Sequence, residues 1–154
     1  MRDFKLWPTK YKMSFWTLAM IAGLLVLSGC SSVKQMNVNM QGMPEMNNGG
    51  HAVVVYICQL KNDKGFLQAT YESFWHDGDK PFQKEVTKET TKKLFPKETI
   101  TEVLEIESET KFIGIAADFF DPDKEAWRKI YPLSSGRSKQ IVIIVGFNKI
   151  EIQY

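Results

Sequence analysis

Three apolar runs of strand length constrain the fold of this chain more than any other feature. They are HAVVVYICQL (51–60), KFIGIAADFF (111–120) and QIVIIVGF (140–147). The turn formers of Asn47–Gly50 precede the first run, and Asp121-Pro122-Asp123 follows the second. Runs that are apolar on both faces are typical of strands covered on both sides. The chain is therefore expected to build sheets with buried central strands.

Shorter segments alternate apolar and polar residues with a period of two, which is typical of half-buried strands. Met36, Val38 and Met40 predict an edge strand, and further strands are expected at 100–106, 127–133 and 150–154. The 85–94 segment is ambiguous, because Glu89 and Lys93 have helical spacing. Its threonines favour a strand, and its lysines suit an unpaired sheet edge.

One short helix is expected between the first two long strands. Leu67, Tyr71, Phe74 and Trp75 fall on one helical stripe, with Asp63 as a possible cap and Asp77-Gly78 as a possible end. Many strands and a single helix predict a mainly β fold, a two-sheet antiparallel β-sandwich with a short helical addition.

The N-terminus has the order of a bacterial lipoprotein signal. Four basic residues precede the uncharged run 13–27, and Leu27-Ser28-Gly29-Cys30 follows it. A membrane-spanning helix needs about 20 apolar residues, so the run is short for an uncleaved anchor, which remains the alternative. We expect cleavage before Cys30 and lipidation of its thiol. The expected organisation is 1–29 signal peptide, 30–35 lipidated tether and 36–154 sandwich domain.

Removal of the signal changes the charge of the chain. Residues 1–29 contain four of the 20 basic and one of the 18 acidic residues, so 16 and 17 remain, a net charge of −1 with neutral histidines. No basic excess is left that would indicate nucleic-acid binding. Cys58 loses its only possible disulfide partner and is expected to be a buried structural thiol.

The segment from 41 to 50 is the candidate site for a partner. It consists of Gln41, Gly42, Met43, Pro44, Glu45, Met46, Asn47, Asn48, Gly49 and Gly50. Ten residues exceed what a tight hairpin needs, and long loops in compact domains are often functional. The two methionines indicate either a contact surface or side chains that fold back on the core.

Signals for catalysis or metal binding are weak. His51 and His76 are expected at exposed ends of a strand and a helix, and Asp118, Asp121 and Asp123 are explained by an Asp-Pro-Asp turn better than by a calcium loop. The chain has no nucleophile elbow and no phosphate loop. We expect no enzymatic activity, no metal and no cofactor.

The order of these elements resembles a known family. The lipobox, the VVVYICQL strand, the segment FLQATYESFW (66–75), the Leu94-Phe95-Pro96 turn and KFIGIAADFF together resemble the TssJ lipoproteins of type VI secretion systems. The resemblance implies a transthyretin-like sandwich at the outer membrane, which Ser31 after the cysteine also favours. It implies a TssM-like inner-membrane partner, docked through its periplasmic C-terminal domain by the loop between the first two strands.

One departure from the family concerns that loop. Members often carry a proline- and arginine-bearing stretch before the second strand, where this chain has Asn47-Asn48-Gly49-Gly50-His51. Individual contacts therefore cannot be transferred, although Met43 and Met46 are expected to matter more than Asn47 and Asn48. The alternative function is a lipid-anchored sandwich that binds a small ligand or peptide near the Leu67–Trp75 stripe.

Overall fold

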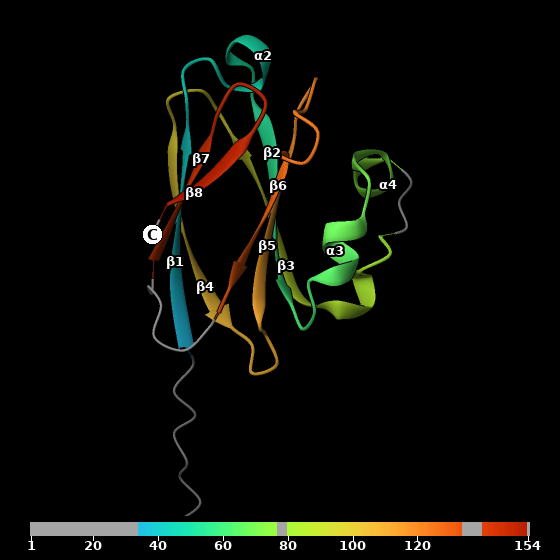
Figure 1. Cartoon of the computed structure of the whole chain (residues 1–154). Helices are drawn as coiled ribbons and strands as arrows, with labels where there is room; N and C mark the ends of the chain where they lie inside the picture. Colours follow the sequence, from blue (N-terminus) through green and yellow to red (C-terminus); the bar gives the residue numbers. More distant parts are fainter. Residues whose placement is uncertain (1–33, 77–79, 134–139, 154) are drawn as a thin grey trace, which may run out of the picture. The chain divides into compact units, whose positions relative to one another are not determined.

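Two four-stranded sheets pack face to face in the computed structural model, which describes residues 34–76, 80–133 and 140–153 (Figure 1). The strands are β1 (Lys34–Gly42), β2 (Val53–Leu60), β3 (Val86–Leu94), β4 (Thr99–Ile106), β5 (Phe112–Asp118), β6 (Arg128–Pro132), β7 (Gln140–Val145) and β8 (Ile150–Gln153). The helical segments are α2 (Met46–Gly50), α3 (Lys64–Gln68), α4 (Tyr71–Trp75) and the 3-10 turn η1 (Gln83–Glu85). The predicted mainly β sandwich is confirmed.

The first sheet has the order β4-β1-β7-β8. The side chains of Met36, Val38 and Met40 are buried, as the alternation predicts. The prediction that β1 is an edge strand is wrong, because β1 pairs with β4 antiparallel and with β7 parallel. Alternation reports that one face of a strand meets solvent, and it carries no information about whether the two edges are paired.

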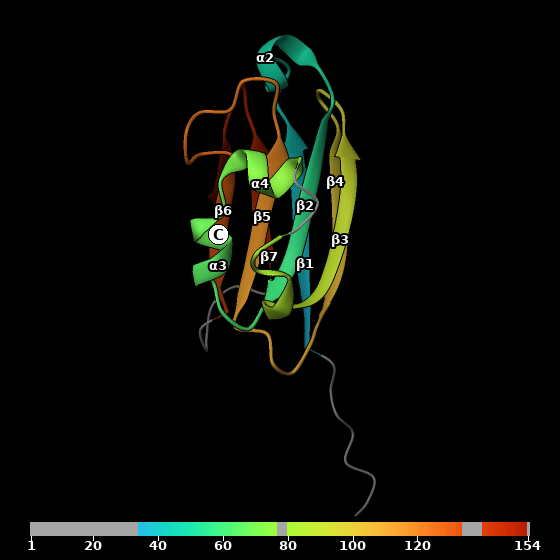
Figure 2. The same cartoon turned by 90° about the vertical axis from the view of Figure 1, so that its right-hand side faces the viewer.

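The second sheet has the order β3-β2-β5-β6 and contains the two long apolar strands at its centre. β2 is buried at seven of its eight positions. Its inner face meets the first sheet, and α3 and α4 lie over the outer face of the second sheet (Figure 2). The 85–94 segment forms the edge strand β3, as its threonines and lysines predict.

The helical addition consists of two short helices where one was predicted. Ala69 is extended, and Thr70 starts α4 with a capping box in which its side chain and that of Ser73 each bond the other's backbone N–H. The break rotates the stripe, so that Phe66 and Phe74 are buried while Leu67 is 45% exposed. Asp63 makes no side-chain cap bond, and the predicted Asp77-Gly78 end lies outside the described residues.

Aromatic rings and one arginine hold this addition on the sheet. Phe74 lies within 5.6 Å, centroid to centroid, of the rings of Tyr56, Phe66 and Trp127. The buried Arg128 guanidinium of β6 donates to the carbonyl oxygens of Phe66 and Ala69 at the end of α3. A cation there satisfies carbonyls that a helix terminus leaves unpaired.

Among the described helices, none is long and apolar enough to cross a membrane.

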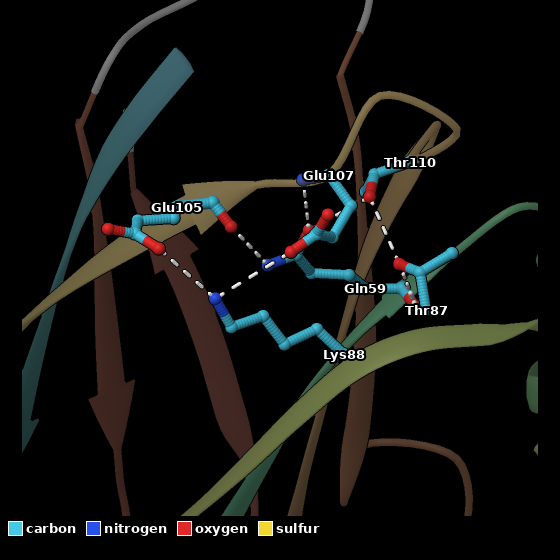
Figure 3. Close-up of polar contacts among 6 residues, drawn as sticks. All are labelled: Gln59, Thr87, Lys88, Glu105, Glu107 and Thr110. Carbon is cyan, nitrogen blue, oxygen red and sulfur yellow. Dashed lines mark hydrogen bonds and ion pairs between the residues drawn. The ribbon is translucent and has the colours of Figure 1, made fainter. Parts of the chain in front are cut away.

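A buried glutamine joins the two sheets at the end where β1 begins (Figure 3). The Gln59 side chain of β2 is 2% exposed, and its Nε2 donates to the carbonyl oxygen of Glu105 at 2.7 Å. Its Oε1 accepts from the Glu107 N–H at 2.9 Å and from the Thr110 hydroxyl at 2.8 Å. Lys88 of β3 adds exposed ion pairs to Glu105 and Glu107. The amide thus ties β2 to β4 and to the turn after it.

Candidate functional site

The candidate partner segment is shorter as a loop than the sequence indicated. Gln41 and Gly42 are the last residues of β1, Met43–Glu45 form a turn, and α2 covers Met46–Gly50. The end of β1 extends the ladder with β4 and β7 through Gln41, which pairs with both strands. The segment that connects β1 to β2 lies at one end of the sandwich (Figures 1 and 2).

The backbone of α2 is a left-handed turn. The φ angles are +50° at Asn47, +58° at Asn48, +119° at Gly49 and +92° at Gly50. Asparagine and glycine tolerate this region far better than other residues do. The Asn47-Asn48-Gly49-Gly50 sequence therefore allows four successive residues with positive φ.

Asn47 locks this turn onto the sandwich. The residue is 1% exposed, its Nδ2 donates to the Ala52 carbonyl oxygen at 2.8 Å, and its Oδ1 accepts from the Phe120 N–H at 2.8 Å. Buried polar groups contribute to specificity when all of them are paired, and both ends of this amide have partners. The side chain joins α2 to the start of β2 and to the segment after β5.

Backbone hydrogen bonds connect the turn to two more segments. The Met43 N–H donates to the Val145 carbonyl at 2.9 Å, and the Asn48 N–H donates to the Phe147 carbonyl at 2.8 Å. Gly42 exchanges two bonds with the β3–β4 turn, donating to Glu98 and accepting from Lys97, each at 2.9 Å. The segment is therefore held in a defined shape by its neighbours.

The two methionines of the segment have different environments. Met46 is fully buried and belongs to the core, whereas Met43 is 38% exposed. Of the two possibilities expected for these methionines, Met46 folds back on the core. Only Met43 can offer its side chain to a partner. Pro44, Glu45 and Gly49 are exposed as well. Asn48 is half-buried, and its Oδ1 meets no hydrogen-bond donor among the described residues.

The residues weighed for chemistry form no metal site among the described residues. His51 and His76 are exposed, as predicted, and Asp118 accepts a hydrogen bond from the Tyr71 hydroxyl at 2.6 Å. In the described part of the chain, no three His, Cys, Asp or Glu side chains are arranged to hold a metal ion. Cys58 is fully buried, and burial raises the pKa of its thiol. A raised pKa disfavours the thiolate that a nucleophile needs.

The stripe proposed for a small ligand is used mainly for packing. Phe74 is 2% exposed and stacks on Phe82 at 5.2 Å between ring centroids. A hollow of about 450 Å³ lies between the edges of β3 and β4, and one of about 310 Å³ lies near the β4–β5 turn. Neither hollow is lined by Trp75 or Leu67.

Three exposed phenylalanines near the candidate segment were not singled out in the sequence. Phe95, Phe120 and Phe147 are 49%, 73% and 49% exposed, and each follows the last residue of β3, β5 or β7 by one or two positions. Phe120 ends the apolar run 111–120, in which both faces were expected to be buried, so its exposure was not predicted. Phe95 and Phe147 were hidden because they were assigned to a turn and a strand.

Comparison with known proteins supplies a family context. A family model described as "Type VI secretion lipoprotein", with VasD, EvfM and TssJ as members, matches residues 33–148. No curated protein matches the chain.

The chain is also similar to solved structures. A chain of a structure described as "Type VI membrane complex" superposes with a TM-score of 0.72 at 21% identity, covering 79% of this chain and 99% of the other. The lipoprotein TssJ1 from Pseudomonas aeruginosa gives 0.70 at 18%, covering 78% and 95%. A chain of a structure described as "T6SS protein TssM C-terminal domain (869-1107) from EAEC" gives 0.68 at 22%, covering 79% and 99%. These similarities support the two-sheet fold.

Proposed function

This chain belongs to the type VI secretion lipoprotein family that includes TssJ, and from that membership we propose that it is a non-enzymatic anchor which docks an inner-membrane component of the secretion complex. The partner proposed is the periplasmic C-terminal domain of a TssM-like protein. The observation that carries the proposal is the locked α2 turn, which presents Met43–Glu45 to solvent at one end of the sandwich.

In the sequence, the proposed anchor Cys30 precedes the first residue of β1, whereas α2 follows the last residue of that strand. Lipidated Cys30 would precede Lys34 by four residues, a reach of about 14 Å for extended chain. β1 has nine residues and spans about 26 Å from Lys34 to Gly42. Two or three acyl chains on one cysteine hold a protein firmly, whereas one chain binds marginally. The domain is thus suited to hold a partner at a distance from its own membrane.

The outer membrane is the proposed location. Ser31 follows Cys30, where lipoproteins retained in the inner membrane often carry aspartate. A protein held in the outer membrane that docks an inner-membrane protein would connect the two membranes across the periplasm. The Cys30→Ser variant is expected to be lost from the outer-membrane fraction, and continued sedimentation of that variant with outer membranes would contradict the lipid anchor.

Docking is tested by a variant that spares the core. Complete deletion of the 41–50 segment would remove buried Met46 and Asn47, so that loss of binding could reflect unfolding. The sharper variant replaces only exposed residues, as Met43→Ser, Pro44→Gly and Glu45→Lys together. Detergent-solubilised lipoprotein is used to capture the periplasmic domain of the TssM-like protein from the same secretion system. We expect the triple variant to lose most of this capture while its thermal unfolding stays close to wild type.

The outcomes separate folding from docking. An unchanged affinity of the triple variant would refute docking through this segment, as would failure of the wild-type protein to capture the partner. A variant with matched chemistry elsewhere, Val103→Ser, serves as the control because Val103 is 54% exposed and lies in the middle of β4, outside the 41–50 segment.

A further inference from the structure

Four of the six large apolar side chains that are exposed in the described residues gather at the end of the sandwich that carries α2. Met43, Phe95, Phe120 and Phe147 are 38%, 49%, 73% and 49% exposed. Each follows the C-terminal end of a strand, and β1, β3, β5 and β7 all end on this side because β1 and β7 are parallel and β2 runs antiparallel to both β3 and β5. Figures 1 and 2 show these strand ends around α2.

Hydrogen bonds fix the four segments to one another. Asn47 bonds the Phe120 N–H through its side chain, and the Asn48 N–H bonds the Phe147 carbonyl. The β3–β4 turn, which carries Phe95, is bonded to both the N–H and the carbonyl of Gly42. The ring of Phe120 also contacts the ring of His51 at 5.3 Å between centroids. The segments that carry the four apolar side chains are therefore fixed to one another at this end of the sandwich.

The loop by itself offers too little apolar surface for tight docking. Met46 is in the core, so Met43 is the only large hydrophobic side chain that the segment exposes. Binding energy at protein interfaces is concentrated in a few residues, among which aromatic side chains are enriched near the centre. Phe120 and Phe147 have the size and the position to supply what the loop lacks.

We propose that Met43, Phe95, Phe120 and Phe147 form a composite docking surface, and that its occupant is a protein domain whose contact face is apolar and recessed to receive these side chains. The inference rests on the proposed function, because it takes the partner docked by the α2 loop as the occupant. It adds three residues from outside that loop and the chemistry of the face they meet.

Charge favours a protein over a lipid surface as the occupant. The segments 43–51, 95–98, 119–124 and 146–149 carry four carboxylates and three lysines, so they have no basic excess. Surfaces that bind anionic membranes are rich in lysine and arginine. An apolar centre with a rim of both charge signs is the usual composition of a protein interface.

The test compares exposed apolar residues inside and outside the surface. Phe120→Ser and Phe147→Ser are made singly and together in the full lipoprotein. Val103→Ser on β4 and Leu67→Ser on α3 serve as matched controls, because these two residues are 54% and 45% exposed. The probe is the purified periplasmic C-terminal domain of the TssM-like protein of the same system. Affinity is measured by calorimetry in detergent at about 50 mM and about 500 mM NaCl. This roughly tenfold range of ionic strength shows whether screened charge interactions contribute to binding.

We expect the double variant to lose about 30-fold or more in affinity, the level of at least one hot-spot residue, and each control to stay within about twofold. The wild-type affinity should change little with salt, because an apolar contact is not screened. A double variant that binds like wild type, while the Met43–Glu45 triple variant fails, would overturn the composite surface and leave loop docking intact. A wild-type protein that does not bind the probe would refute the proposed function itself.

Two further outcomes would identify a different occupant. Light scattering that shows a wild-type dimer dispersed by Phe120→Ser and Phe147→Ser would assign the surface to a second copy of this chain. Flotation of the unlipidated chain that begins at Ser31 with vesicles of phosphatidylethanolamine and phosphatidylglycerol, abolished by the same substitutions, would assign it to a lipid surface. Either result would overturn the proposal of a protein domain as occupant.

Discussion

The Oδ1 of Asn47 accepts a hydrogen bond from the backbone N–H of Phe120 at 2.8 Å, although 73 positions separate the two residues. The same amide donates to the Ala52 carbonyl oxygen. One buried side chain therefore connects the turn after β1 with the segment after β5 and with the approach to β2. The position of the α2 turn depends on this contact between distant parts of the chain.

Replacement of Asn47 by glycine is expected to destabilise the domain. Glycine accepts the φ of +50°, so the substitution removes the two hydrogen bonds without backbone strain. The carbonyl of Ala52 and the N–H of Phe120 lose their partner, and an unsatisfied buried group costs about 1–3 kcal/mol. Urea denaturation followed by circular dichroism measures the free energy of unfolding.

Asn48→Gly is the matched control for Asn47→Gly. Its φ is +58°, and its Oδ1 has no hydrogen-bond donor among the described residues, so little is lost beyond the added freedom of the unfolded chain. Asn47→Gly should be the less stable of the two variants by about 1–3 kcal/mol. Equal unfolding midpoints and slopes would show that the Asn47 amide does not hold the turn.

Gly42→Ala is expected to disturb the α2 end through a steric clash. An alanine Cβ would lie 2.4 Å from the Phe95 carbonyl oxygen and 2.7 Å from the Met46 Sδ, and the backbone oxygen cannot move without displacing the β3–β4 turn. Overpacking of this kind costs about 1–3 kcal/mol. At Gly146 the nearest atom would be 3.6 Å away, so Gly146→Ala should be tolerated. Thermal denaturation of both variants tests the contrast, which fails if their melting temperatures coincide.

The local sequence pattern predicted the burial of individual strands better than it predicted which strands pair with one another. Burial on both faces of β2 and the exposed edge position of β3 were visible in the sequence, because periodicity and composition report the environment of a single strand. The position of β1 between β4 and β7 was not, since pairing is decided by contacts between residues far apart in sequence.

The candidate site shows the same limit. The turn-forming composition of Asn47–Gly50 was readable, and the structure places a left-handed turn there. The different burial of Met43 and Met46 was not readable, because it depends on where the turn returns the chain to the core. Phe147 comes close to the turn because its carbonyl accepts from the Asn48 N–H, and Phe95 because the β3–β4 turn bonds Gly42. These contacts join residues that are far apart in sequence.

Gln59→Leu is expected to weaken the joint between the sheets. The substitution keeps the approximate volume but leaves the Glu105 carbonyl, the Glu107 N–H and the Thr110 hydroxyl without the amide (Figure 3). We expect a loss of about 2–4 kcal/mol in the free energy of unfolding, since several buried groups lose partners together. The exposed Gln35→Leu of β1 should change the same quantity by less than about 0.5 kcal/mol. Similar effects of the two substitutions in urea denaturation would contradict the structural role of Gln59.

Alkaline pH is expected to destabilise the domain through two tyrosines. Burial, followed by the hydrogen bond to Glu89, raises the pKa of Tyr56. Burial and the hydrogen bond to Asp118 raise the pKa of Tyr71. A folded-state pKa above the unfolded value of about 10 means that the stabilising contribution is complete below pH 10 and is lost as the pH rises further.

The matched variants for this pH dependence are Tyr56→Phe and Tyr71→Phe. Without the hydroxyl, the folded state no longer retains a proton that the unfolded state loses, so the decline in stability between about pH 10 and 12 should become shallower than in wild type. Urea denaturation at a series of pH values measures the slope. An identical slope in the double variant would assign the alkaline decline to other groups, such as the exposed Lys61, whose pKa is raised by Glu109.

Cys58 is expected to be unreactive in the folded protein. It is fully buried, and desolvation raises the pKa of its thiol, so the reactive thiolate is scarce at pH 8 and the sulfur is out of reach of the reagent. In the Cys30→Ser protein Cys58 is the only cysteine, which allows intact-mass spectrometry to follow a single alkylation by iodoacetamide. The added mass should be absent after incubation of the native protein and complete in 8 M urea, at about pH 8 in both cases. Modification of the native protein at a rate near that of the unfolded one would mean that β2 opens readily, because a fully buried thiol can be reached only when the segments that cover it move away.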